Sequence, residues 1–114
     1  MKKVTRNDLV LKVFWDIETK KSFSPILSSL DIRRLFRQDE NLSKFNFTKR
    51  QINASISSCV YHKFLQIVKD DTKEKFNTRY VITQKGKFKI RAVISGYWRC
   101  VCNNLGIDYK NREI

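Results

Sequence analysis

The sequence is poor in the residues that usually interrupt helices and strands. Its 114 residues include one proline and three glycines, and no segment is repeated or of low complexity. Such a chain is predicted to be compact throughout, without long linkers. With 41% apolar residues the chain can form one hydrophobic core, but 114 residues are too few for two stable domains with a core each. We therefore expect a single domain over residues 1–114.

Long apolar runs are also missing. No stretch approaches the roughly 20 apolar residues of a membrane-spanning helix, and no uninterrupted apolar run of a signal peptide follows the basic N-terminus. The three cysteines are an odd number, which argues against a disulfide framework and fits a reducing compartment. We expect a cytoplasmic protein with no membrane partner, associated with the nucleoid in a bacterium, or in the nucleus or cytoplasm of the host if it is viral.

Residues suited to catalysis or metal binding are few and poorly spaced. His62 is the only histidine, and neither a nucleophile motif nor a Gly-rich phosphate loop accompanies it. The atoms of a Cys₃His zinc site are present in Cys59, His62, Cys100 and Cys102. Their spacing is unusual for zinc, so buried structural thiols are the prediction. The acidic residues of 70–74 could serve as metal ligands in a nuclease, but mixed-charge loops of this kind are common and usually have no such role. We expect no catalysis, no metal and no other cofactor.

Acidic residues are scarce relative to basic ones. The 24 Lys and Arg residues outnumber the 11 Asp and Glu residues, which gives a net charge of +13. The excess is spread over both halves of the chain, so it belongs to the body of the protein and not to a tail. Such a field attracts polyanions, whether DNA, RNA or an acidic protein surface.

Two helices are predicted in the first half of the chain. Apolar residues recur at helical spacing from Leu9 to Ile17, which indicates a helix over roughly 6–20. A second helix can begin at Ser24-Pro25, or closer to Ile32 at Ser29 and Asp31, and we favour the later start. It carries the densest arginine cluster on or near its outward face: Arg33, Arg34 and Arg37. Their guanidinium groups suit phosphate oxygens, although such a face can also be merely solvated.

A capping box marks the start of a third helix at Lys49. The Thr48 hydroxyl is expected to accept from a backbone N–H, and Gln51 to reach back. At about 100° per residue, one arc of this helix is apolar: Ile52, Ile56, Cys59 and Val60. The opposite, outward side is polar and uncharged in its middle: Arg50, Gln51, Ala54, Ser57, Ser58 and Tyr61.

A β-hairpin and a last helix are predicted in the second half. Strands over 64–68 and 78–83 flank a mixed-charge loop over 69–77. Residues 87–95 alternate like a strand, yet they also fit one helical arc with Thr83 as N-cap, and we favour a helix over 84–105 that stops at Gly106. This helix is so apolar around Tyr97 and Trp98 that it either packs on the core or pairs with a second copy in a homodimer.

The order of these elements resembles the winged helix-turn-helix family. The resemblance covers about residues 6–105 and includes the phrase Tyr80-Val81-Ile82-Thr83-Gln84-Lys85-Gly86, which is similar to the Tyr-x-x-Thr-x-x-Gly phrase that closes the wing in many members. It implies an α+β fold of three helices, a β-hairpin wing and a C-terminal helix. It also implies that the helix over 49–63 enters the major groove and that the 69–78 loop lies against the backbone or minor groove.

The candidate DNA contacts follow from that arrangement. Gln51 and Asn53 can read base edges, Arg50 can fork onto guanine or phosphate, and Lys49 can position the helix. The full set is Lys49, Arg50, Gln51, Asn53, Ala54, Ser57 and Ser58, with Arg33, Arg34 and Arg37, and with Lys73 and Lys75 of the loop. Neighbouring acids dilute the charge of the loop. We predict a sequence-specific protein that binds double-stranded DNA, a small transcriptional regulator. The alternatives are a viral or mobile-element inhibitor or adaptor that binds an acidic surface of a protein partner, and an RNA binder.

Overall fold

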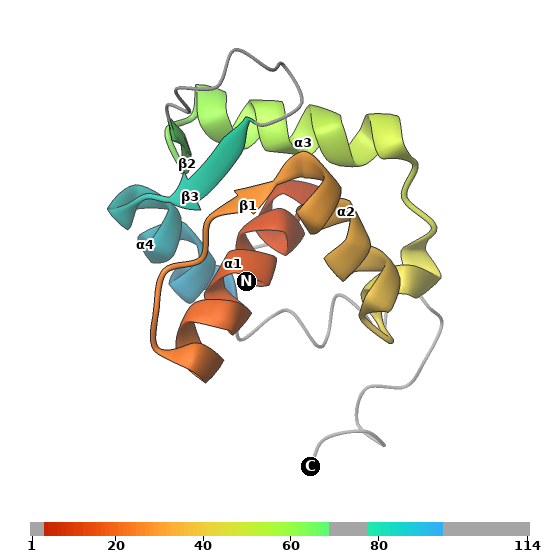
Figure 1. The fold of residues 1–114 in the computed structure, drawn as a ribbon, viewed down its shortest axis with the longest axis horizontal. Coiled ribbons are helices and arrows are strands. Elements are labelled where there is room, and N and C mark those ends of the chain that lie inside the picture. Colours follow the sequence, from red (N-terminus) through yellow and green to blue (C-terminus); the bar gives the residue numbers. More distant parts are fainter. Residues whose placement is uncertain (1–3, 69–77, 95–114) are drawn as a thin grey trace.

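The fold is described by a computed structural model over residues 4–68 and 78–94 (Figure 1). Within these ranges the chain is α+β, with four α-helices and a small antiparallel sheet of three strands. The elements are α1 (Arg6–Lys21), β1 (Leu27–Ser28), α2 (Ser29–Gln38), the 3₁₀ turn η1 (Leu42–Phe45), α3 (Lys49–Tyr61), β2 (Leu65–Val68), β3 (Arg79–Ile82) and α4 (Gln84–Val93). None of these helices is long and apolar enough to cross a membrane.

All four α-helices begin after a Ser or Thr whose hydroxyl accepts the backbone N–H three residues on. These caps are Thr5, Ser28, Thr48 and Thr83. In the first three helices the side chain at that third position reaches back to the cap's N–H and closes a capping box: Asp8, Asp31 and Gln51. The predicted box at Thr48 is confirmed, and so is the later start of the second helix, which begins at Ser29.

The sheet has the order β1-β3-β2, with both pairs antiparallel. The predicted hairpin is confirmed as β2 and β3. The strand β1 was not predicted, because two residues are too few to show a period of two. Phe64, predicted to open the first strand of the hairpin, instead takes part in the C-terminal cap of α3: its N–H donates to the Cys59 carbonyl (2.8 Å), while Lys63 adopts a left-handed φ of 64°. With the Lys63 N–H bonded to the Val60 carbonyl (3.0 Å), this is a Schellman motif.

Residues 84–93 form a helix and not a strand, which confirms the favoured alternative for the part that the structure describes. The predicted continuation to residue 105, with Tyr97 and Trp98, lies outside the described residues. Ile90 and Val93 are buried where α4 packs on α1. Lys87 forms an ion pair with Glu18 of α1 (2.7 Å), so part of the basic charge of α4 serves this packing.

The core surrounds α1, which lies at the centre of the fold and contacts α2, α3, α4 and β3 (Figure 1). Its largest fully buried side chains come from five elements: Leu9, Val10, Leu11, Phe14, Ile32, Ile56, Leu65, Ile90 and Val93. Of the predicted apolar arc of α3, Ile52, Ile56 and Cys59 are buried and Val60 is half-buried. The core therefore holds one side of α3 and leaves the other side outside.

Candidate nucleic-acid interface

The outward side of α3 is the largest exposed part of the predicted site. In Figure 1 this helix lies along the upper edge of the molecule, with α1 and α2 below it. Most of its predicted contact residues are exposed: Lys49, Arg50, Gln51, Ala54 and Ser57. Tyr61, which is 82% exposed, extends the same face toward the end of the helix. The face offers hydrogen-bonding groups in its first turn and short side chains in its middle.

Three predicted contact residues of α3 are less available than their positions suggested. Ser58 was predicted on the outward side but is half-buried, and its hydroxyl accepts a hydrogen bond from Asn7 Nδ2 of α1 (2.9 Å). Asn53 is also half-buried. The Oε1 atom of Gln51 accepts the Thr48 N–H (2.9 Å), which leaves its Nε2 group as the free donor. Both half-buried residues lie at the borders of the outward arc, where neighbouring elements begin to cover the helix.

The first turn of α1 holds α3 in place, and the sequence did not reveal this role. Arg6 donates from Nε to the hydroxyl of Ser55 (2.6 Å), and its guanidinium lies 5.9 Å from the ring centroid of Phe47. Asn7 binds Ser58, as described, and its carbonyl lies 3.7 Å from Cys59 Sγ. Ser55 is buried, since it follows Ile52 by three residues and lies on the apolar arc. That spacing was the one available signal.

Cys59 is a structural thiol, as predicted. Burial, followed by the nearby charge of Asp8, raises the pKa of the Cys59 thiol to about 12. The thiol is therefore protonated at neutral pH and is poorly suited to metal binding or nucleophilic attack. No group of three or more potential metal ligands occurs in residues 4–68 and 78–94. Cys100 and Cys102 of the considered zinc set lie outside the described residues.

Two of the three clustered arginines meet the start of α3. Arg33 and Arg37 of α2, together with Lys49, line a cleft of about 410 Å³ between α2, η1 and α3. Arg34 is exposed but does not line it, so the cluster divides between two surfaces. Two candidate regions that were predicted separately are thus brought together. The remaining candidates, Lys73 and Lys75, lie outside the described residues.

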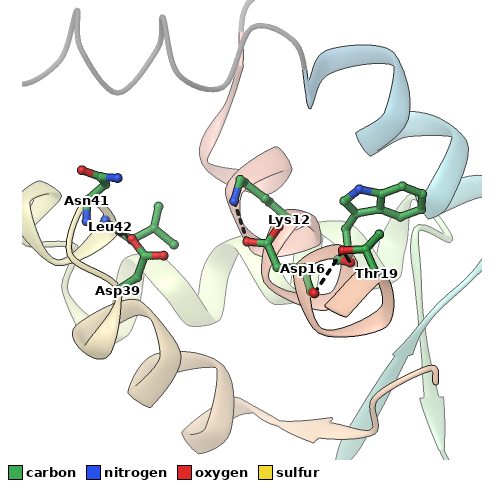
Figure 2. Close-up of polar contacts among 7 residues, drawn as sticks. Lys12, Asp16, Thr19, Asp39, Asn41 and Leu42 are labelled. Atoms are coloured by element: carbon green, nitrogen blue, oxygen red, sulfur yellow. Dashed lines mark hydrogen bonds and ion pairs between the residues drawn. The ribbon is translucent and has the colours of Figure 1, made fainter. Parts of the chain in front are cut away.

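The turn from α2 into η1 shapes one wall of this cleft. The Asp39 carboxylate accepts the backbone N–H groups of Asn41 and Leu42, both at 2.9 Å (Figure 2). These bonds start η1 and bring Leu42 to the inner side of the turn, where it is buried and lines the cleft. Asp39 itself does not line the cleft. The Asp39 carboxylate therefore stabilises the wall of the cleft from outside, and the residues that line the cleft remain positively charged.

Comparisons of the chain with protein-family models, curated proteins and solved structures found no match. A function must therefore be inferred from the geometry and charge of the residues themselves.

Proposed function

We propose that the chain is a winged-helix protein that binds double-stranded DNA in a sequence-specific manner and regulates transcription without catalysis. In this proposal α2, η1 and α3 form the helix-turn-helix, and the hairpin of β2 and β3 forms the wing. The α+β architecture and the order of its elements support this assignment. The proposal implies a location in the cytoplasm or on the nucleoid, or in the nucleus of a host.

The observation that carries the proposal is the exposed polar side of α3. A helix of 13 residues is about 20 Å long, and its diameter suits the B-DNA major groove, which is roughly 12 Å wide. The short side chains of Ala54 and Ser57 allow close approach to base edges. Arg50 can donate to guanine O6 and N7, and the free Nε2 of Gln51 can donate to a base acceptor.

The basic residues around α3 suit backbone contacts. Arg34 and Arg37 are exposed on the neighbouring helix, and Lys49 lies at the start of α3. Contacts of this kind fix the register of a protein on the duplex but carry no sequence information. With a net charge of +13 the affinity is expected to fall steeply with salt.

The test is selection from a randomised pool of duplex DNA at about 0.15 M salt, where attraction by charge alone is largely suppressed. We expect an enriched motif, and we expect Arg50→Ala to relax the preference at one base pair at a cost of about 1–3 kcal/mol. Arg91→Ala is the matched control, because Arg91 is an exposed arginine on α4. Unchanged affinity and preference in Arg50→Ala would show that α3 does not read the groove.

A second candidate function, binding to a protein partner, is favoured by the open edge of the sheet. The Thr83 N–H donates to the carbonyl of Phe64 directly opposite it (3.0 Å). Since bonded and non-bonded pairs alternate along an antiparallel ladder, Leu65 and Ile67 turn their N–H and C=O groups toward the free edge of β2. No described strand pairs with that edge. An extended segment of a partner can bind there as an added strand.

The surface beside this edge also suits an acidic partner. A groove of about 630 Å³ is lined by apolar residues of α3 and β2 and by Lys63 and Lys85. Ile67 in this groove is 47% exposed. Selection from a displayed peptide library should then enrich peptides that combine apolar and acidic side chains, and Ile67→Lys should abolish their binding. Phe88→Lys, at an exposed apolar residue of α4, is the control. No enrichment, or equal losses in both variants, would exclude this role.

A further inference from the structure

The cleft between α2 and the start of α3 combines a closed apolar floor with a basic rim. Phe36, Leu42 and Ile52 form the floor, and all three are buried. The rim carries the cations Arg33, Arg37 and Lys49, which come from two helices. No Asp or Glu is among its lining residues in the part of the chain that the structure describes.

The three cations occupy positions that are unfavourable without an anion. Arg33 and Arg37 are four residues apart on α2, where like charges on one helix face repel. Lys49 is the first residue of α3, and a cation is disfavoured at the positive end of a helix. The first turns of α1 and α2 each contain an aspartate, but the first turn of α3 contains no acid. None of the three cations forms an ion pair with a carboxylate of residues 4–68 or 78–94.

Arg33 adds a second, independent observation. Its Nε atom is buried and has no hydrogen-bond acceptor among the described residues. A buried donor of a charged group that lacks an acceptor is costly, and such groups are rare in folded proteins. An oxygen atom bound in the cleft would supply the missing acceptor, and the fixed fork of an arginine suits a phosphate oxygen in particular.

We infer that this cleft binds a phosphate group. The ligand is either a free or terminal phosphate, as in inorganic phosphate and phosphomonoesters, or a phosphodiester of a nucleic-acid backbone. In this site Arg33 donates through its buried Nε, and Arg37 of α2 and Lys49 of α3 add their charges at the rim. Arg33 and the apolar floor belong to the cleft alone, whereas Arg37 and Lys49 are also among the backbone contacts proposed above, so the site is tested without duplex DNA.

The test titrates the full-length protein, without duplex DNA, with three probes: inorganic phosphate, a dinucleotide with a 5′-phosphate, and the same dinucleotide without it. Nuclear magnetic resonance of the arginine Nε–H groups reports binding at Arg33 directly. Arg33→Gln and Arg37→Gln should weaken binding by roughly tenfold or more, the loss expected for a charge-assisted hydrogen bond. Arg34→Gln is the matched control: it removes the same charge from the same helix but does not line the cleft.

The outcomes separate the site from diffuse attraction and also identify its ligand. A saturable shift of the Arg33 Nε–H signal that is lost in Arg37→Gln and kept in Arg34→Gln supports the site, even if Arg33→Gln fails to fold. Preference for inorganic phosphate and the 5′-phosphorylated probe assigns a terminal phosphate. Equal binding of both dinucleotides assigns the backbone diester. Equal weakening in Arg34→Gln and Arg37→Gln, or no saturation with any probe, overturns the inference. Loss of duplex binding alone would overturn the proposed function and leave this site intact.

Discussion

The helices α1 and α3 begin alike and differ in one decisive residue. Both follow a threonine cap, and in both the third residue reaches back to close a capping box. In α1 that residue is Asp8, which is 0% exposed and accepts from the Thr5 N–H (2.9 Å) and hydroxyl (3.0 Å). In α3 it is the neutral, exposed Gln51. One start carries its own negative charge, and the other carries none.

The difference indicates what each helix start is built for. The carboxylate of Asp8 offsets the positive end of α1 inside the fold, near the amine of Lys89 (3.9 Å). The start of α3 adds Lys49 and Arg50 to a helix end that is already positive. The start of α3 therefore lacks the compensating charge that α1 carries, and under the proposals above an external anion would supply it.

The start of α4 provides a third case, in which the box is replaced by a strand contact. Its cap Thr83 donates its N–H to the carbonyl of Phe64, and the third residue is Gly86. A Cβ at this position would lie 2.2 Å from the same carbonyl oxygen and 2.8 Å from Ile82 Cγ1. A side chain at the third position is therefore excluded, and the Tyr-x-x-Thr-x-x-Gly phrase has a physical reason in this chain.

Gly86→Ala should have the largest effect on stability. Because the added methyl group collides with the backbone of Phe64, α4 must move away from that residue, and we expect a loss of about 3 kcal/mol in the free energy of unfolding. Urea denaturation measures it. Ala92→Gly is the control, since Ala92 is exposed on the same helix and should lose only about 1 kcal/mol. A loss in Gly86→Ala no larger than in this control would contradict the close approach of Gly86 to the Phe64 carbonyl.

Asp8→Ala tests the comparison of α1 and α3 directly. Removing the buried carboxylate opens the box and leaves the Thr5 N–H without its acceptor, so we expect a loss of about 2 kcal/mol. Gln51→Ala makes the same change in α3, at an exposed site, and should cost about 1 kcal/mol. Denaturation curves of both variants decide the matter. Equal losses would show that burial of the α1 box adds nothing.

The pH dependence of stability sharpens the comparison further, because Cys59 packs against the buried start of α1. Burial raises the pKa of this thiol to about 12 in the folded protein, above its ordinary value of 9.0. As pH rises past 9, the unfolded chain loses the thiol proton while the native state keeps it, so stability falls by up to about 1.4 kcal/mol per pH unit. Between pH 9 and 10 we expect a loss of roughly 1 kcal/mol.

Cys59→Ala isolates this contribution, because the titration of other groups is common to both proteins. The difference in unfolding free energy between the natural protein and the variant should be constant below pH 8 and should shrink above pH 9. A difference that stays constant up to pH 10 would contradict the raised pKa of the buried thiol.

The helix starts could be predicted from sequence because a cap and its partner are three residues apart. The Thr48 box and the later start of α2 were visible for that reason, and the periodicity of α3 identified its buried arc. The strand β1 was not visible, because its two residues are ordered only by pairing with Tyr80 and Arg79. The clash that explains Gly86 likewise involves Phe64, a distant residue.

The residues of the candidate site could be listed from the sequence, but their arrangement in space could not. The arginine cluster and the first turn of α3 were both identified, but the separation of Arg33 and Arg37 from Arg34 depends on how η1 brings α2 to α3. The contacts of Arg6 and Asn7 to α3 span about fifty residues of sequence, as the Asn7–Ser58 separation of 51 shows. No local pattern reports such a contact.

Gln51→Glu should have the smallest effect on stability and an opposite effect on function. Glutamate also closes a capping box with threonine and offsets the positive end of the helix, so α3 would resemble α1 and gain about 0.5 kcal/mol. The same carboxylate would repel phosphate groups and remove the Nε2 donor of Gln51. We therefore expect duplex affinity at about 0.15 M salt to fall while the unfolding free energy rises.

This variant is informative because its duplex affinity and its free energy of unfolding are expected to change in opposite directions, whereas a damaged fold lowers both. Asp31→Asn, the reverse change at the matching position of α2, should lower stability and leave affinity nearly unchanged. If Gln51→Glu gained stability without losing affinity, the start of α3 would lie outside the DNA interface, and its missing carboxylate would have no functional explanation.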